Sequence, residues 1–322
     1  MGDPVGIGPE VVARAFVQGA AEGCVVVGDV AVMRRAMALV GDAWPVAQLD
    51  APGDAVPPRC MPVWQPANLP VGLAELDWGR VDARAGAAAA ACIEAAVRAV
   101  QRGEGGPMVT APIHKAAFAA AGVSFPGHTE MLQALAGGVP VRMMLANDEL
   151  RVVLVTIHQS LRTAIDAVTF DAVLDTLRIA HASGAGRRIA VAGLNPHAGE
   201  EGLFGDEERT IIAPAVAAAR AEGIDARGPF APDTVFMRAR RGEFDLVVAM
   251  THDHGLIPVK YLGVEHGVNV TLGLPFVRTS PDHGTAFDIA GRGVADASSL
   301  MAAIRWARGA ADREAMRLRP TP

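Results

Sequence analysis

The segment LVVAMTHDHG (residues 246–255) decides the fold class of this chain. It begins as an uninterrupted apolar run, which stops at Thr251 and is followed at once by His252, Asp253 and His254. A short apolar run bounded by polar residues is typical of a strand buried on both faces, as in a parallel sheet. Because ligands bind beyond the carboxyl ends of such strands, these polar residues are candidates for a site at the end of the strand.

Similar apolar runs alternate with segments rich in Ala, Arg and Glu along the chain. The predicted strands are residues 24–29, 107–112, 150–158, 188–197 and 246–252. The clearest helical patterns between them are residues 31–40, 170–183 and 207–223. This alternation predicts an α/β fold with a doubly wound, mostly parallel sheet. Residues 42–69 are rich in proline and weakly patterned, so we expect a short strand and loops there.

Composition excludes several classes of protein. The chain has 322 residues, of which 51% are hydrophobic and 20% charged, as in a globular protein of two domains or one large α/β unit. A formal net charge of −6 and the absence of Lys/Arg runs argue against a nucleic-acid partner. Three scattered cysteines provide no disulfide framework, which suits a reducing cytoplasm. The longest apolar stretch, residues 85–97, contains Glu94 and indicates a packed helix, so we expect no membrane partner.

The stretch GDPVGIGPE (residues 2–10) resembles a glycine-rich turn that leads into a helix. Pro9 suits the first turn of that helix, and Glu10 interacts favourably with the helix dipole. Such a turn normally follows a strand, so we expect a first strand encoded upstream of Met1. The stretch does not match GxGxxG and is a weak dinucleotide fingerprint.

Three of the nine histidines share one position relative to the predicted strands. His158 follows VVLVTI, His197 follows IAVAGLNP and His252 follows LVVAMT. Three imidazoles with an open fourth position suit a catalytic divalent metal. Each histidine taken alone could instead cap its strand through backbone hydrogen bonds. Their shared position favours the metal site.

A second group of residues is suited to anions. In FPGHTEML (residues 125–132), His128 and Thr129 precede a helix that we expect to begin near Glu130, where exposed N–H groups attract anions. Taken alone, Thr129 is as well explained as an ordinary helix cap. Further cations and an amide occur in one later segment, as Lys260, Asn269 and Arg278. Lys and Arg beside apolar strands predict a phosphate or carboxylate partner.

The segment SPDHGTAFDIAGRGVADA (residues 280–297) is too polar and too rich in glycine for a strand. It could be a linker made of turns. The alternative is a loop that wraps a nucleotide, with backbone groups near the phosphates and Asp288 on the ribose hydroxyls.

Several long, ordered motifs together resemble the family of 4-hydroxythreonine-4-phosphate dehydrogenase, PdxA. They are GDPVGIGPE, APIHK, GHTEML, NPHAGEEGLFGDEE, THDHGLIPVKYLG and GVNVTLGLPFVRTSPDHGTAFDIAGRG. The resemblance covers the chain from Gly2 to about Ile304. It implies a fold like that of isocitrate and isopropylmalate dehydrogenases, with two α/β domains around a central cleft. Residues 1–120 and 278–322 would form the nucleotide-binding domain, and residues 121–277 the metal, substrate and dimerisation domain.

The resemblance also implies roles for particular residues. It assigns one divalent metal (Zn, Mg or Co) to His158, His197 and His252. Substrate binding is assigned to His128, Thr129, Lys260, Asn269 and Arg278. The carboxylates of Asp233 and Asp253 would lie beside the reacting hydroxyl as catalytic groups. The 280–297 segment is similar to the adenosine-binding loop of isopropylmalate dehydrogenases, which implies cofactor contacts from His283, Gly284 and Asp288.

The implied reaction is NAD-dependent oxidation of 4-phosphohydroxy-L-threonine followed by loss of CO₂, a step of pyridoxal phosphate biosynthesis. The acidic Asp288 favours NAD, although NADP is possible. The family implies a homodimer in which metal ligands and substrate-binding residues come from different subunits. Within the family, the alternative is a dehydrogenase of D-threonate or D-erythronate 4-phosphate. An aromatic dihydrodiol dehydrogenase shares the scaffold, but its substrate has no phosphate and does not explain GHTE.

One position departs from the family pattern. His254 stands where glutamine is expected, and a histidine can titrate near neutral pH whereas a glutamine cannot. This departure leaves the substrate undecided between an amino acid and a sugar acid. From a different class of protein, a metal hydrolase with three histidines would use the same ligands without a nucleotide. The loop at residues 280–297 argues against that alternative.

Overall fold

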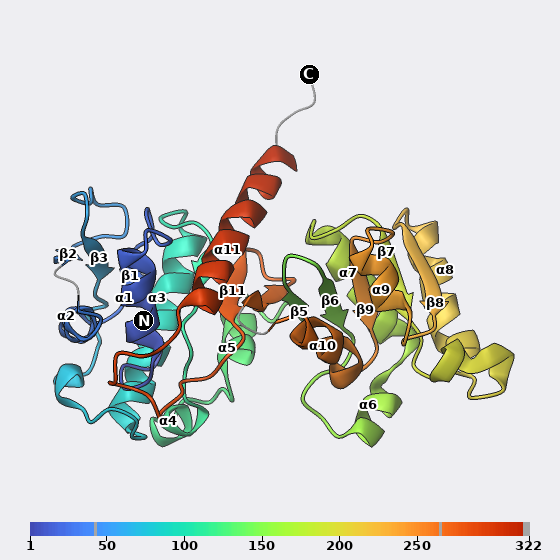
Figure 1. The fold of residues 1–322 in the computed structure, drawn as a ribbon, viewed down its shortest axis with the longest axis horizontal. Helices are drawn as coiled ribbons and strands as arrows, with labels where there is room; N and C mark the ends of the chain where they lie inside the picture. The colour runs from blue at the N-terminus through green and yellow to red at the C-terminus, as the bar shows by residue number, and fades with distance from the viewer. Residues whose placement is uncertain (42–43, 264–265, 318–322) are drawn as a thin grey trace. The chain divides into compact units, whose positions relative to one another are not determined.

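The computed structural model describes residues 1–41, 44–263 and 266–317. The chain divides into two compact units (Figure 1). Unit 1 contains Met1–Val139 and Leu274–Ala311, and unit 2 contains Pro140–Gly273 with the described residues from Asp312 onward. Strands and helices alternate through both units, which confirms the predicted α/β class.

Unit 1 contains a small parallel sheet in the order β1-β3-β2 and a parallel pair of strands, β4 and β11. The strands are β1 (Val26–Val27), β2 (Val46–Leu49), β3 (Met61–Trp64), β4 (Met108–Val109) and β11 (Arg278–Pro281). The helices are α1 (Gly8–Val17), α2 (Val30–Leu39), η1 (Leu73–Glu75), α3 (Ala83–Gln101), α4 (Lys115–Ala120), α5 (His128–Leu135) and α11 (Ser298–Arg317).

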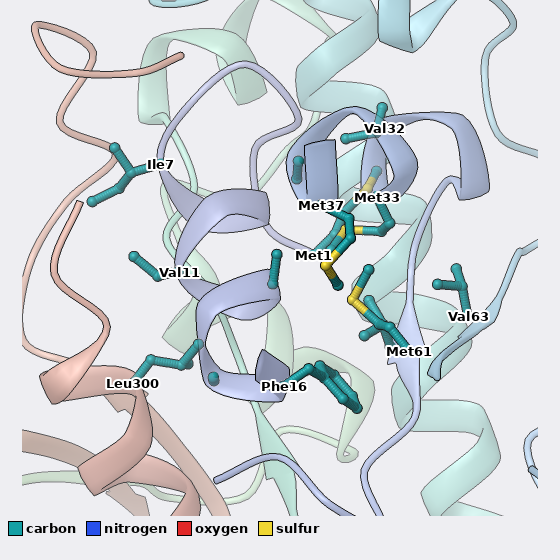
Figure 2. Close-up of a cluster of buried hydrophobic side chains, with 14 of the residues drawn as sticks. Met1, Ile7, Val11, Phe16, Val32, Met33, Met37, Met61, Val63 and Leu300 are labelled. Carbon is teal, nitrogen blue, oxygen red and sulfur yellow. The ribbon is translucent and has the colours of Figure 1, made fainter. Parts of the chain in front are cut away.

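The front of unit 1 folds as the sequence predicts. Pro9 lies in the first turn of α1, and Asp29 caps α2 by accepting a hydrogen bond from the Val32 N–H at 2.8 Å. The apolar faces of these helices join one buried cluster with β3 and α11. Figure 2 shows Met1, Met33 and Met61 in this cluster. The flexible methionine side chains suit the irregular space between short elements.

A cavity of about 480 Å³ lies next to Met1 in unit 1. Residues of β1, β4, α1, α3 and α11 line it. The Met1 nitrogen donates to the Val27 carbonyl at 2.9 Å, and the Asp3 N–H donates to the Pro112 carbonyl at 2.9 Å. These bonds connect β1 to the segment after β4 through the first residues of the chain.

The strands of unit 2 run in the order β10-β5-β6-β9-β7-β8. They are β5 (Arg142–Ala146), β6 (Arg151–Leu154), β7 (Ile189–Ala192), β8 (Ala226–Phe230), β9 (Leu246–Ala249) and β10 (Val268–Leu272). The helical segments are α6 (Leu161–Ala167), α7 (Phe170–Ala182), η2 (Pro196–Gly202), η3 (Glu208–Ile212), α8 (Ala213–Ala221), α9 (Val235–Arg240) and α10 (His252–Tyr261). Strands β6, β9, β7 and β8 are parallel neighbours, and α9 and α10 pack against them (Figure 1).

The prediction of a mostly parallel sheet holds for only part of unit 2. Strand β5 pairs antiparallel with both β6 and β10. The side-chain oxygen of Asn147 accepts hydrogen bonds from the Glu149 and Leu150 N–H groups at 2.9 and 2.8 Å. This Asx turn reverses the chain between β5 and β6. The antiparallel β5–β6 pair is therefore a local consequence of a tight turn, whereas the β5–β10 pair joins segments that are distant in the chain.

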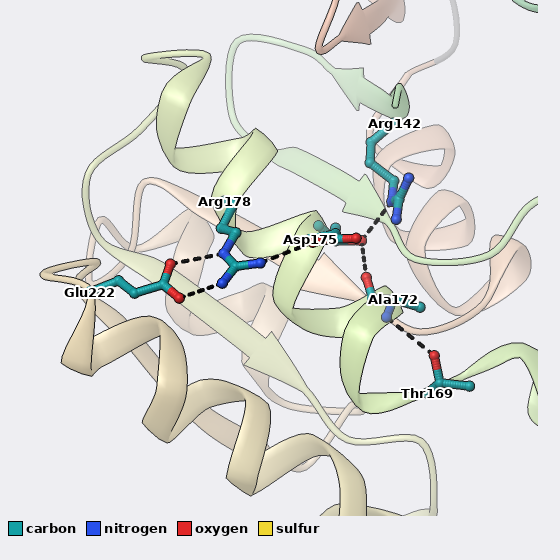
Figure 3. A network of polar contacts seen from close by, with 7 residues as sticks. Arg142, Thr169, Ala172, Asp175, Arg178 and Glu222 are labelled. Atoms are coloured by element: carbon teal, nitrogen blue, oxygen red, sulfur yellow. Dashed lines mark hydrogen bonds and ion pairs between the residues drawn. The ribbon is translucent and has the colours of Figure 1, made fainter. Parts of the chain in front are cut away.

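Polar side chains connect helices at the edge of unit 2. Arg178 lies between Glu222 and Asp175, and its two bonds to Glu222 measure 2.8 and 2.5 Å (Figure 3). The side chain of Arg142 donates to the Thr176 hydroxyl at 2.7 Å. These exposed ion pairs link α7 to the residue after α8, and each adds little to stability because water screens it.

The structure also decides the expectations for residues 42–69 and 85–97. Residues 42–69 hold two strands, β2 and β3, where we expected one short strand. The helix predicted around residues 85–97 is α3, whose apolar residues are mostly buried. Among the described residues, no helix is long and apolar enough to cross a membrane.

Candidate functional site

His158 and His252 come together at the ends of neighbouring strands. His158 follows β6, His252 is the first residue of α10 after β9, and these two strands are paired in parallel. The centroids of the two imidazole rings are 5.6 Å apart. His158 has a positive φ of 42°, which is uncommon outside glycine and marks a locally constrained backbone.

Asp253 is a hydrogen-bond partner of His252. Its Oδ1 lies 2.7 Å from Nδ1 of the imidazole. With the ring proton on Nδ1, His252 donates to this carboxylate and Nε2 keeps its lone pair. Carboxylates in this position orient metal-binding imidazoles and select their tautomer. Asp253 can therefore serve both His252 and a substrate group nearby.

The paired imidazoles fit part of a divalent metal site. Two imidazoles whose nitrogens lie about 2.0–2.1 Å from one tetrahedral cation have ring centroids about 5 Å apart, close to the observed spacing. Within residues 1–41, 44–263 and 266–317, no group of three or more His, Cys, Asp or Glu side chains is arranged to hold a metal ion. Two imidazoles leave half of a tetrahedral coordination sphere for other donors.

His197 lies in a left-handed turn beyond β7. Every residue from His197 to Glu201 has a positive φ, between 44° and 82°, although only Gly199 is a glycine. Left-handed backbone costs about 1–2 kcal/mol for each residue that carries a Cβ. The ring centroid of His197 lies 6.1 Å from that of Phe204. The structure therefore does not place His197 in a three-ligand group with the other two histidines, and the predicted triad stays a prediction.

The other predicted residues of unit 2 occupy separate elements. Asp233 is exposed in the segment between β8 and α9, and His254 is exposed in the first turn of α10. Lys260 is exposed near the end of α10, and Asn269 is half-buried on β10. Their functional roles stay predictions.

Unit 1 contains a buried cationic site formed by Arg278 and His128. Arg278 is the first residue of β11, is only 3% exposed, and donates to the Thr110 hydroxyl at 2.6 Å. Burial lowers the pKa of Arg278 to about 10. Burial, and then the charge of Arg278, lower the pKa of His128 well below its usual value of 6.5. A buried guanidinium beside a neutral imidazole is suited to an anion.

Helix α5 begins at His128, two residues earlier than expected. Gly127 is its N-cap, so Thr129 lies inside the first turn and is not the cap residue. Glycine is also tolerated as an N-cap residue. The sequence pattern favoured Thr129 at that position only because threonine is a preferred N-cap residue. His128 and Thr129 are therefore both in the first turn, where N–H groups lack helical partners.

The segment after β11 runs as a loop up to α11, as the sequence predicts. The Thr285 carbonyl accepts the Ile7 N–H at 3.0 Å, and Glu10 accepts the Ala295 N–H at 2.7 Å. These bonds hold the loop on the start of α1. In the loop, Gly284 and Asp288 are exposed, whereas His283 is half-buried with its Nδ1 3.0 Å from the Gly284 carbonyl oxygen. An exposed carboxylate on an anchored loop can accept hydrogen bonds from ribose hydroxyls, and the cofactor role of Asp288 stays a prediction.

Sequence reasoning missed three residues that organise these sites. Thr110 holds Arg278, Glu208 holds the backbone before His197, and Glu10 anchors the loop after β11 as well as capping the dipole of α1. Each lies in a quoted motif or one residue from it. The partners of Thr110 and Glu10 are far away in the chain, whereas those of Glu208 lie 14 and 13 residues before it. Only the preference of buried carboxylates for several N–H donors could have singled out the two glutamates.

Most of the chain is similar in sequence to known proteins. Residues 20–307 match the family model described as pyridoxal phosphate biosynthetic protein PdxA. The chain belongs to the PdxA family. It is 54% identical over 314 residues to a 4-hydroxythreonine-4-phosphate dehydrogenase of Beijerinckia indica, covering 95% of this chain and 92% of that protein. It is 45% identical over 319 residues to a D-threonate 4-phosphate dehydrogenase of Pectobacterium atrosepticum, covering 95% and 96%.

Membership of the PdxA family also settles the fold and the class of activity. A crystal structure of 4-hydroxythreonine-4-phosphate dehydrogenase from Klebsiella pneumoniae matches 97% of this chain and 96% of its own, with a TM-score of 0.90 and 43% identity. This match confirms the fold that the resemblance implied. The protein is a dehydrogenase of the PdxA family, and so an oxidoreductase that uses a nicotinamide cofactor.

Proposed function

We propose that this protein oxidises 4-phosphohydroxy-L-threonine with NAD⁺ and a divalent metal, giving 2-amino-3-oxo-4-phosphooxybutanoate, NADH and a proton. The ketone is β to a carboxylate, so loss of CO₂ then gives 3-amino-2-oxopropyl phosphate for pyridoxal phosphate biosynthesis. The observation that carries the proposal is the His158–His252 pair at adjacent strand ends, in a chain 54% identical to a protein named for this reaction.

His158 and His252 would hold the cation (Zn, Mg or Co), and His197 would complete the imidazole set. When bound there, a divalent cation lowers the pKa of a coordinated hydroxyl group. The spacing of the two rings and the contact of Asp253 with His252 support this assignment. Nδ1–H of His252 donates to Asp253, which keeps Nε2 of the imidazole available as a ligand.

The protein's own side chains would move the proton and hold the substrate. Asp253 or Asp233 accepts the hydroxyl proton, a role typically worth about 10²–10⁴-fold in rate. Arg278 and His128 bind the phosphate: the guanidinium supplies a permanent charge, and the neutral imidazole supplies an N–H donor. The burial of Arg278 supports this assignment because a buried cation gains most from an anionic partner, and the half-buried His128 lies close enough for its pKa to feel that charge. Thr129, Lys260 and Asn269 complete the proposed substrate contacts.

The cofactor would bind against the loop after β11. A nicotinamide accepts the hydride in a reaction of this class. His283 and Gly284 would lie by the adenosine or its phosphates, and Asp288 would accept the ribose hydroxyls. The exposed carboxylate of Asp288 favours NAD because it would repel the extra phosphate of NADP.

A second candidate is oxidation of D-threonate or D-erythronate 4-phosphate in sugar-acid catabolism. The 45% identity to a relative named D-threonate 4-phosphate dehydrogenase supports this second candidate. So does His254, which lies one residue from Asp253 and introduces a titratable ring into that first turn of α10. The two substrates differ by an amino group in place of a hydroxyl.

A homodimer with a shared active site is part of the proposal. Large apolar side chains are exposed in unit 2 on the elements that start beside the site histidines, including Leu161 at 64%, Ile257 at 65% and Leu203 at 72%. A second copy of the chain would cover them. Two inactive variants, His158→Ala and Arg278→Ala, can test sharing because a mixed dimer retains one intact site if the metal ligands and the substrate-binding residues come from different subunits. Recovery of activity on mixing supports sharing, and no recovery contradicts it. A cytoplasmic location is supported by the three free cysteines.

The function is tested by NADH formation, followed by its near-ultraviolet absorbance. The substrates are 4-phosphohydroxy-L-threonine, D-threonate 4-phosphate and D-erythronate 4-phosphate, each with added divalent metal and again with chelator. Metal-dependent turnover of the amino acid alone supports the proposal. Turnover of only the sugar acids replaces it with the second candidate. No turnover of any would contradict both.

A further inference from the structure

The left-handed turn that carries His197 is attached to a buried carboxylate. Glu208 is the first residue of η3, and it is only 5% exposed. Its Oε1 accepts the N–H groups of Leu194 and Asn195, both at 2.7 Å. Its Oε2 accepts from the side-chain amide of Asn195 at 3.0 Å. Three N–H donors from the residues just before His197 therefore converge on this one side chain.

Two glycines make room for the Glu208 carboxylate. A Cβ on Gly193 would lie 3.0 Å from Oε1, and a Cβ on Gly199 would lie 2.7 Å from Oε2. Gly193 directly follows the last residue of β7, and Gly199 is the middle residue of the left-handed turn. The backbone on both sides of His197 is thus in close contact with the same carboxylate.

We propose that Glu208 is the positioning residue for His197. The inference rests on the proposed function, because it takes His197 to be a metal ligand. The carboxylate contacts the backbone on both sides of His197, from Gly193 to Gly199, and so sets the orientation in which the imidazole would bind the cation. Groups that hold a metal ligand in this way are conserved contributors to metal affinity, and losing one weakens binding by about 10–100-fold.

Glu208 is unsuited to be a ligand itself. Both of its oxygens already accept N–H groups, and the side chain is buried beneath the turn. The neighbouring Glu207 offers a matched comparison: its Oε2 accepts from the Asn195 amide at 2.7 Å but from neither backbone N–H. A role limited to holding the loop together would leave the metal site unchanged when Glu208 is altered mildly.

The test compares Co²⁺ binding by the full chain and by Glu208→Gln, Glu207→Gln and His197→Ala, using the visible absorption of bound Co²⁺. Glutamine keeps the volume of Glu208 but places an NH₂ group against the Asn195 amide, so one hydrogen bond must break. We expect Glu208→Gln to melt close to the wild type, to bind Co²⁺ about 10–100-fold more weakly, and to show a shifted spectrum at saturation. Glu207→Gln should stay within about twofold of the wild type.

Each outcome has a definite meaning. Wild-type Co²⁺ affinity and spectrum in Glu208→Gln, while His197→Ala binds weakly, would overturn the role of Glu208 and leave the proposed function intact. Equal Co²⁺ binding by the wild type and His197→Ala would overturn the metal assignment, and the inference with it. If Glu208→Gln does not fold, Glu208→Asp takes its place. This variant keeps the carboxylate but withdraws it by one methylene, and an unchanged spectrum and affinity would again overturn the inference.

Discussion

Replacing the buried Arg278 should make the protein more stable and less able to bind phosphate. The guanidinium is 3% exposed, and burial lowers its pKa to about 10. Each unit of pKa shift corresponds to about 1.4 kcal/mol, so burying this charge costs the fold roughly 3 kcal/mol. At neutral pH the group is charged in the folded and unfolded chains, and the full cost applies. It would be relieved only as pH rises above about 10, through the lowered pKa of the folded state.

The variant Arg278→Met removes this cost and loses a hydrogen bond. The bond to Thr110 at 2.6 Å is worth about 1.5–3 kcal/mol when the donor is charged. The expected net change is a stabilisation of about 1 kcal/mol, or a few degrees in Tm. Inorganic phosphate at 100 times its Kd should add about 2.7 kcal/mol to the wild type and nothing to the variant.

Thermal denaturation with and without phosphate measures both effects. Arg142→Met is the control, because Arg142 donates to Thr176 at 2.7 Å in unit 2 and has no proposed anion role. It should keep the full response to phosphate. The reasoning is refuted if Arg278→Met is less stable than the wild type by more than about 1 kcal/mol and phosphate still stabilises it fully.

Three more expectations follow from unit 1. Because the pKa of His128 is lowered well below 6.5 in the folded state, the free energy of unfolding of the wild type should fall by up to about 1.4 kcal/mol per pH unit below pH 6.5. Urea unfolding at several pH values should show a smaller fall for His128→Asn. Asp288→Ser should shift the ratio of kcat/KM towards NADP by about tenfold or more, equivalent to about 1.4 kcal/mol; an unchanged ratio would remove Asp288 from the cofactor site. A short valine-rich extension before Met1 should raise Tm for two reasons. It converts the buried Met1 amine, whose pKa is lowered by burial, into an uncharged amide, and its apolar side chains can pack into the 480 Å³ cavity. An unchanged or lower Tm would contradict this.

The candidate site was predictable where each residue's position depends on its own strand. His158 and His252 follow apolar runs that become adjacent parallel strands, and their side chains meet as the pattern indicates. His197 also follows such a run, but it lies five positions beyond the last residue of β7, Ala192, in a left-handed turn. No local propensity predicts that backbone, because several of its residues carry a Cβ that disfavours it.

The fold shows the same division between local and distant causes. The helices α2 and α7 begin where Asp29 and Thr169 accept hydrogen bonds from N–H groups three residues later, which is a signal readable from the chain. Strand β3 lies between β1 and β2 and contains Pro62, although proline cannot donate to a ladder. The buried cluster around Met61 and Val63 outweighs that preference.

The sequence alone determined the α/β class, the family, the strand ends that carry the histidines, and the loop after β11. These properties depend on residue type, on spacing and on side chains able to form short-range hydrogen bonds, all of which the chain carries before it folds. The tertiary structure alone decided that Arg278 is buried against Thr110 and that Glu208 holds the backbone before His197. It did so because burial and the convergence of several N–H groups on one carboxylate arise only when distant segments pack together.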